Sequence, residues 1–104
     1  MTKPLVVIVP HRLGKEGAKR RLRDGVQQLR LKLSLVGAAA VDESWSGDEM
    51  RFRVAALGQV AIGRIEAAEA SVTVEVELPD SLGWLGSLVA DRVRREGTLL
   101  LERK

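Results

Sequence analysis

The sequence predicts a two-layer α+β domain in which a mostly antiparallel sheet of about five strands is covered on one face by two helices. Two segments, 50–54 and 72–78, alternate strictly between apolar and polar residues, which is typical of strands with one face in water. Two longer segments repeat apolar residues at helical spacing and can cover the other face. The 104 residues fit a single domain over 1–104, with the element order β-α-β-β-β-β-α.

The first strand and the first helix occupy the start of the chain. Residues 4–9 form a short β-branched run, which favours a strand, and residues 10–14 are typical of a turn. A helix is predicted from Lys15 to about Leu35, and Gly37 fits its end. The apolar stripe of this helix consists of Ala18, Leu22, Gly25 or Val26, Leu29 and Leu33.

Four strands follow as a meander. They are predicted at residues 41–45, 50–54, 59–65 and 71–78. Ser46–Asp48 is typical of a tight hairpin turn, and residues 66–70 are expected to turn the chain again. The last strand has the clearest pattern, because its valines and Leu78 all face one side.

A second helix is predicted after Pro79, which ends the last strand. Asp80 or Ser81 is expected to cap this helix, and Gly97 is expected to kink or end it. Its apolar positions are Leu82, Leu85, Val89 and Val93, followed by Leu99 and Leu100.

The composition excludes several classes of function. With no cysteine and one histidine, the chain has no disulfide, no thiolate metal site, no thiol nucleophile and few options for zinc. No serine lies in a G-x-S-x-G setting, and no phosphate-binding glycine loop is present. The longest apolar runs are too short for a membrane span or a signal peptide. We therefore expect a non-enzymatic protein with no cofactor and no metal.

The remaining candidates for chemistry have structural explanations. His11 is expected to be a turn residue that hydrogen-bonds near the start of the first helix. Glu75 and Glu77 share one strand face, and we expect them to be solvated or paired with arginines of neighbouring strands. Those arginines are Arg51, Arg53 and Arg64.

The net charge of +3 conceals a segregation along the chain. Residues 1–35 carry +7, residues 36–80 carry −6 and residues 81–104 carry +2. A basic segment beside an acidic one has two interpretations: a surface for an anionic partner, or charge complementarity within the protein or between subunits.

Seven residues are candidates for a binding surface. Three basic residues fall together on one flank of the first helix, with a fourth beyond them, and three apolar residues lie off the apolar stripes of the two helices. The candidates are Lys19, Arg20, Arg23, Arg30, Leu31, Leu35 and Trp84.

Each group also has an ordinary structural explanation. The basic flank fits a solvated helix surface, on which Arg20 pairs with Glu16 or Asp24 one turn away. The apolar residues fit contacts with a loop or sheet edge, a homodimer interface or an apolar surface. The basic residues have no aromatic residues between them, which is unfavourable for single-stranded nucleic acid.

Three motifs, taken in their order along the chain, resemble the sequence pattern of a known family. They are Pro10-His11-x-Leu13-Gly14-x-x-x-Ala18, then Trp45-x-Gly47-Asp48-x-Met50-x-Phe52, then the alternating strand to Leu78 followed by Pro79 and a helix. The order and spacing are similar to those of the polyhydroxyalkanoic acid system, or polyhydroxyalkanoate granule region, family over about residues 5–100. The resemblance implies a cytoplasmic bacterial protein encoded near polyester storage genes and associated with granules. It implies no catalytic residues.

Three functional hypotheses follow. The first is a non-enzymatic accessory protein of polyhydroxyalkanoate storage that binds a granule surface or a granule-associated protein through the seven candidate residues, and that can form a homodimer. The alternative is a nucleic-acid-binding module that uses the basic first helix. The third, a ligand pocket near His11 and Trp45, has the weakest support in the sequence.

Overall fold

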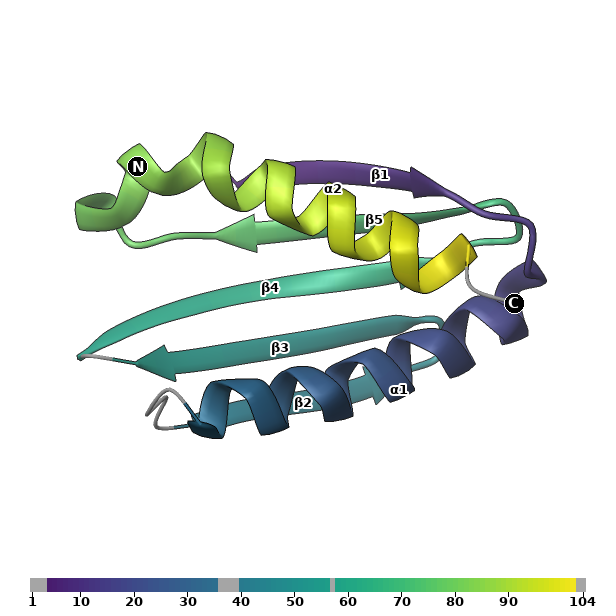
Figure 1. The fold of residues 1–104 in the computed structure, drawn as a ribbon, viewed down its shortest axis with the longest axis horizontal. Helices are drawn as coiled ribbons and strands as arrows, with labels where there is room; N and C mark the ends of the chain where they lie inside the picture. The colour runs from purple at the N-terminus through teal and green to yellow at the C-terminus, as the bar shows by residue number, and fades with distance from the viewer. Residues whose placement is uncertain (1–3, 36–39, 57, 103–104) are drawn as a thin grey trace.

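The fold is taken from a computed structural model, which describes residues 4–35, 40–56 and 58–102. Five strands form one sheet in the order β1-β5-β4-β3-β2, and every neighbouring pair is antiparallel (Figure 1). The elements are β1 (Leu5–Pro10), α1 (Gly14–Leu35), β2 (Ala40–Ser46), β3 (Glu49–Ala56), β4 (Gln59–Ala67), β5 (Ser71–Glu77), the 3-10 helix η1 (Asp80–Leu85) and α2 (Gly86–Glu102). The predicted α+β class and element order are confirmed.

Both helices lie on one face of the sheet (Figure 1). α1 leads from edge strand β1 to the other edge strand, β2, and α2 lies over β1 and β5. The helices meet where Gly25 of α1 faces Leu100 of α2, and a side chain at Gly25 would overlap the leucine methyl groups. From this contact the helices diverge, so that the C-terminal end of α1 and the N-terminal end of α2 lie at the same end of the molecule.

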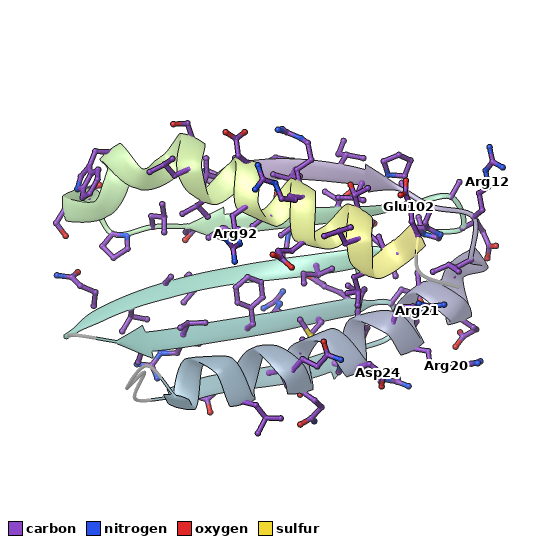
Figure 2. All side chains as sticks on the ribbon, in the orientation of Figure 1. Arg12, Arg20, Arg21, Asp24, Arg92 and Glu102 are labelled. Carbon is purple, nitrogen blue, oxygen red and sulfur yellow. The ribbon has the colours of Figure 1, made fainter. Side chains whose placement is uncertain are left out.

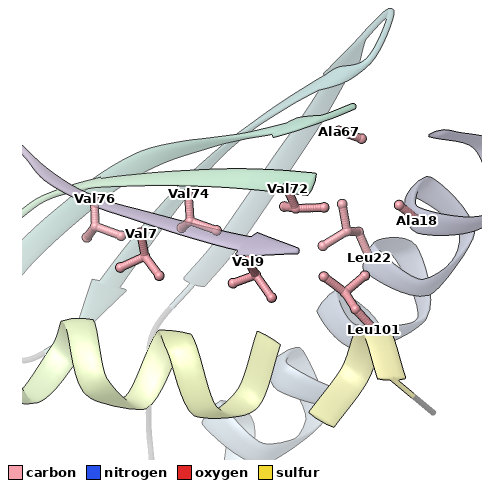
Figure 3. Packing of buried hydrophobic residues seen from close by; sticks show 9 residues of the cluster. All are labelled: Val7, Val9, Ala18, Leu22, Ala67, Val72, Val74, Val76 and Leu101. Carbon is pink, nitrogen blue, oxygen red and sulfur yellow. The ribbon is translucent and has the colours of Figure 1, made fainter. Parts of the chain in front are cut away.

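The core lies between the helices and the β1–β5 side of the sheet (Figure 3). The strands contribute mainly valines, which alternate with exposed residues as the two-residue period of a strand requires. α1 contributes the predicted Ala18, Leu22 and Val26, all of which are buried. The nine residues of the central cluster are Val7, Val9, Ala18, Leu22, Ala67, Val72, Val74, Val76 and Leu101.

The outer face of the sheet carries cross-strand ion pairs, as predicted for a face in water. Arg64 forms an ion pair with Glu75 on β5 and lies 3.4 Å from Glu49 on β3 (Nη1 to Oε1). These contacts raise the pKa of Arg64 and lower that of Glu75, because each charge stabilises the other.

The predicted capping of the last helix is wrong. The chain after Pro79 first forms the 3-10 helix η1, which has no side-chain cap, and the hydroxyl of Ser81 instead lies 3.4 Å from the side-chain oxygen of Gln59. The α-helix begins only at Gly86, so Trp84 lies before α2 and not in its first turn.

Three further predictions are also wrong. Two concern the last helix, and the third concerns the end of strand β4. α2 continues through Gly97, where the lack of a side chain lets the helix approach Val9 closely. Leu101, and not Leu99, enters the core, because it lies one turn after Gly97 on the face that packs against β1. β4 extends to Ala67, beyond its predicted end at Ile65. Gly37 lies outside the described residues, as do the side chains of Leu29, Leu33, Leu82 and Leu85.

Candidate functional site

Lys19, the first candidate cation, is held inside a contact between α1 and the β2–β3 turn. Its Nζ lies 3.4 Å from Oδ1 of Asp48 and 3.9 Å from Oε1 of Glu16, and only 12% of its side chain is exposed. The same ammonium lies 5.8 Å from the ring centre of Trp45. A cation with these partners contributes to the fold and has little surface to offer a ligand.

Arg23 shares the indole with Lys19. Its guanidinium carbon lies 5.1 Å from the centre of the Trp45 ring, and the residue is exposed. Arg20 is also exposed, but the predicted pairs with Glu16 and Asp24 do not form in the described part of the chain, since Glu16 pairs with Lys19 instead. Of the basic candidates whose side chains are described, only Arg20 and Arg23 reach the surface.

Asp48 joins a second lysine to the same turn. The Nζ of Lys15 lies 3.1 Å from Oδ2 of Asp48, and this contact raises the pKa of Lys15 and holds that of Asp48 below its usual value. Gly47 permits the tight turn because its φ of 60° favours glycine. The turn borders a surface hollow of about 470 Å³, lined by Lys15, Ser46, Asp48, Glu49, Glu66, Ala67, Ala68 and Glu69.

The hollow does not form the predicted pocket, because its lining includes neither His11 nor Trp45. Its one cation is already paired with Asp48, and the carboxylates there do not gather into a set of metal ligands. Across the described residues as a whole, no group of three or more acidic or histidine side chains could hold a metal ion.

His11 has the structural role predicted for it. The residue is buried, its backbone N–H donates to the carbonyl of Ala70, and its Nδ1 accepts the N–H of Leu13 at 3.1 Å. Because Nδ1 accepts, the proton lies on Nε2, which donates to the carbonyl of Ala68 at 3.0 Å. The imidazole therefore links the β1–α1 turn to the β4–β5 turn and has both nitrogens engaged.

Large apolar side chains, in contrast, are exposed at the end of the molecule where the helices diverge. Trp84 in η1 is 74% exposed, Leu88 at the start of α2 is 62% exposed and Leu31 near the end of α1 is 69% exposed. Beneath the diverging helices the inner sheet residues Phe52 and Val54 are only half-buried. We call Trp84, Leu88 and Leu31 the apolar end of the protein.

The structure does not bring all the sequence-predicted candidates together. Figure 2 shows Arg20 and Arg21 near the end of the molecule opposite the N-terminus of α2, and thus away from the apolar end. The backbones of Arg30 and Leu35 lie in the last turns of α1, and their side chains lie outside the described residues. Of the candidates whose side chains are described, Arg20 therefore lies apart from the apolar end, which includes Trp84 and Leu31.

Sequence reasoning missed Leu88 and misplaced Leu99, which is 60% exposed near the other end of α2. A signal for Leu88 was present, because it lies about 100° around the helix from Val89, a residue of the predicted apolar stripe. Neither described helix is long and apolar enough to cross a membrane.

Comparison with known proteins gives one family match. The model of a family described as "Putative polyhydroxyalkanoic acid system protein" matches residues 5–100, which is nearly the whole chain. Comparisons with curated proteins and with solved structures give no match. The matched region contains the three motifs noted in the sequence, whose residues build the two turns and the core described above.

Proposed function

Because the chain belongs to the polyhydroxyalkanoic acid system family, we propose that it binds the surface of polyhydroxyalkanoate granules, without catalysis, through its apolar end. The observation that carries the proposal is the exposure of Trp84, Leu88 and Leu31 at one end of the molecule. Large apolar side chains left exposed to water are a common feature of surfaces that contact an apolar partner.

A polyester surface suits these side chains chemically. Its aliphatic segments would remove the leucines and the indole from water, and complete burial of one such side chain contributes about 1.5–3 kcal/mol. The indole N–H of Trp84 can donate a hydrogen bond to an ester carbonyl, as tryptophan does where an apolar phase meets water.

The nucleic-acid alternative has weaker support. Phosphate binding needs several free cations, and Lys19 is occupied by Asp48 and Trp45 while Arg23 stacks on the same indole. Retention of the protein on nucleic acid that is lost as salt rises would favour this alternative.

Co-sedimentation with granules tests the proposal. The purified protein is mixed with granules stripped of their own proteins, and the pelleted fraction is compared for the wild type, Trp84→Ser and Trp84→Ser/Leu88→Ser. We expect the wild type to pellet and the double variant to lose at least tenfold in affinity. Stripped granules separate binding to the polyester from binding to a granule-associated protein, which requires native granules.

Leu99→Ser is the matched control, because Leu99 is as exposed as Leu88 but lies near the other end of α2. We expect Leu99→Ser to pellet like the wild type, and circular dichroism verifies that each variant is folded. Failure of the wild type to pellet with either granule preparation, or equal losses for Leu88→Ser and Leu99→Ser, contradicts the proposal.

A further inference from the structure

β1 is an edge strand that carries no charged side chain to oppose pairing. Among the described strands, β5 alone lies beside it, and Val6 and Ile8 are 52% and 62% exposed on the outer face. Edge strands of monomeric proteins commonly carry charged residues, yet residues 4–10 include none. The opposite edge, β2, carries Asp42 and Glu43.

The hydrogen-bonding phase of β1 follows from its contacts with β5. The N–H of His11 donates to the carbonyl of Ala70, which continues the register that pairs Pro10 with Ser71. Because residues in an antiparallel ladder alternate between facing the partner and facing away, Val6 and Ile8 direct their N–H and C=O groups to the free edge. The backbone nitrogen of Pro10 likewise faces the free edge, so the lack of an N–H group there removes no hydrogen bond to β5.

We propose that β1 pairs antiparallel with β1 of a second copy of this chain, centred on Val7. In this register Val6 of each copy lies opposite Ile8 of the other, and all four N–H groups at the two edges find carbonyl partners. Pro4 lies opposite Pro10, and neither has an N–H to satisfy. Because the prolines bracket residues 5–9, this register lets those residues of both copies overlap completely.

The pairing also removes exposed apolar surface. On the outer face, Val6 and Ile8 of the two copies form two neighbouring cross-strand pairs, in which β-branched side chains pack well. The two-fold axis runs perpendicular to the sheet, so the ten-stranded sheet carries both helix layers on one side. The arrangement does not depend on granule binding, but it would present two apolar ends in one layer and raise avidity for any surface.

The solution mass tests the pairing. In sedimentation velocity at about 50 µM we expect the wild type at twice the chain mass of 11.4 kDa. Val6→Lys/Ile8→Lys places two like charges on each edge and is expected to sediment as a monomer while keeping its circular dichroism spectrum. Ile62→Lys is the control, because Ile62 is also exposed on the outer face but lies on β4, inside the sheet, and this variant is expected to remain a dimer.

Crosslinking tests the register. The chain has no cysteine, and opposite residues in a hydrogen-bonded antiparallel pair have Cα atoms about 5.5 Å apart, which a disulfide can span. A mixture of Val6→Cys and Ile8→Cys proteins is expected to form the mixed disulfide faster than either protein forms its own. A monomeric wild type, a dimeric Val6→Lys/Ile8→Lys variant, or no preference for the mixed disulfide overturns the proposal.

Discussion

The Nζ of Lys19 lies 3.4 Å from Oδ1 of Asp48, and this contact ties α1 to the β2–β3 turn. It explains why the charge segregation of the sequence does not produce an open basic surface there. Part of the basic excess of residues 1–35 meets the acidic excess of residues 36–80 inside one molecule. At this point the structure supports the second interpretation of the segregation, internal complementarity.

We predict that Asp48→Asn lowers the thermal stability, because Lys15 and Lys19 both lose their carboxylate partner. The folded pKa of Asp48 lies below its ordinary value of 3.8, so the carboxylate stabilises the fold fully above that pH. As the pH falls through the folded pKa, the difference between wild type and variant should disappear. Melting curves from pH 7 to pH 2 measure it, with Asp42→Asn as control. A difference that persists at pH 2 would show that the charge is not the cause.

We predict that His11→Ala destabilises the protein by roughly 2–4 kcal/mol, because two hydrogen bonds are lost and buried groups of Ala68 and Leu13 stay unpaired. Urea unfolding measures the change. Arg12→Ala, the neighbouring exposed position, should change stability by less than about 0.5 kcal/mol. Equal small effects at both positions would mean that the imidazole does not hold the two turns together.

We predict that Gly63→Ala destabilises the protein by about 1–3 kcal/mol, because the new methyl group would overlap the ring of Phe52 and the carbonyl of Glu75. Gly83→Ala is the control, since nothing lies within 4 Å of a methyl group there. Urea unfolding of both variants measures the difference. An unchanged midpoint for Gly63→Ala would mean that Phe52 does not pack on this glycine.

The fold was predicted well from the sequence, because the spacing of apolar residues within each short segment indicates a strand or a helix. One buried face of each strand is specified by the alternation of apolar and polar residues in 50–54 and 72–78. The buried face of the first helix is specified by the stripe of Ala18, Leu22 and Val26. The ends of elements were predicted less well. Asp80 has the side chain of a helix cap, yet the chain first forms a 3-10 helix before α2 begins at Gly86.

The candidate surface was predicted only in part, because its parts depend on tertiary contacts. The positions of Trp84 and Leu31 off the stripes left open whether they contact a loop or sheet edge or face outward, and the structure shows both side chains exposed. The partnership of Lys19 with Asp48 spans 29 residues, and no helical or strand period connects two such positions. Likewise, only the diverging helices bring the end of α1 and the start of α2 to the same end of the molecule.

The emission of Trp84 tests the central claim most directly. In Trp45→Phe, Trp84 is the single tryptophan, and its 74% exposure predicts emission typical of an indole in water. We predict a blue shift when stripped polyhydroxyalkanoate granules are added, because the indole leaves water at the polyester surface. Trp84→Phe, which keeps only Trp45, should show no shift. Binding of the protein to granules with the emission of Trp84 unchanged would contradict the account.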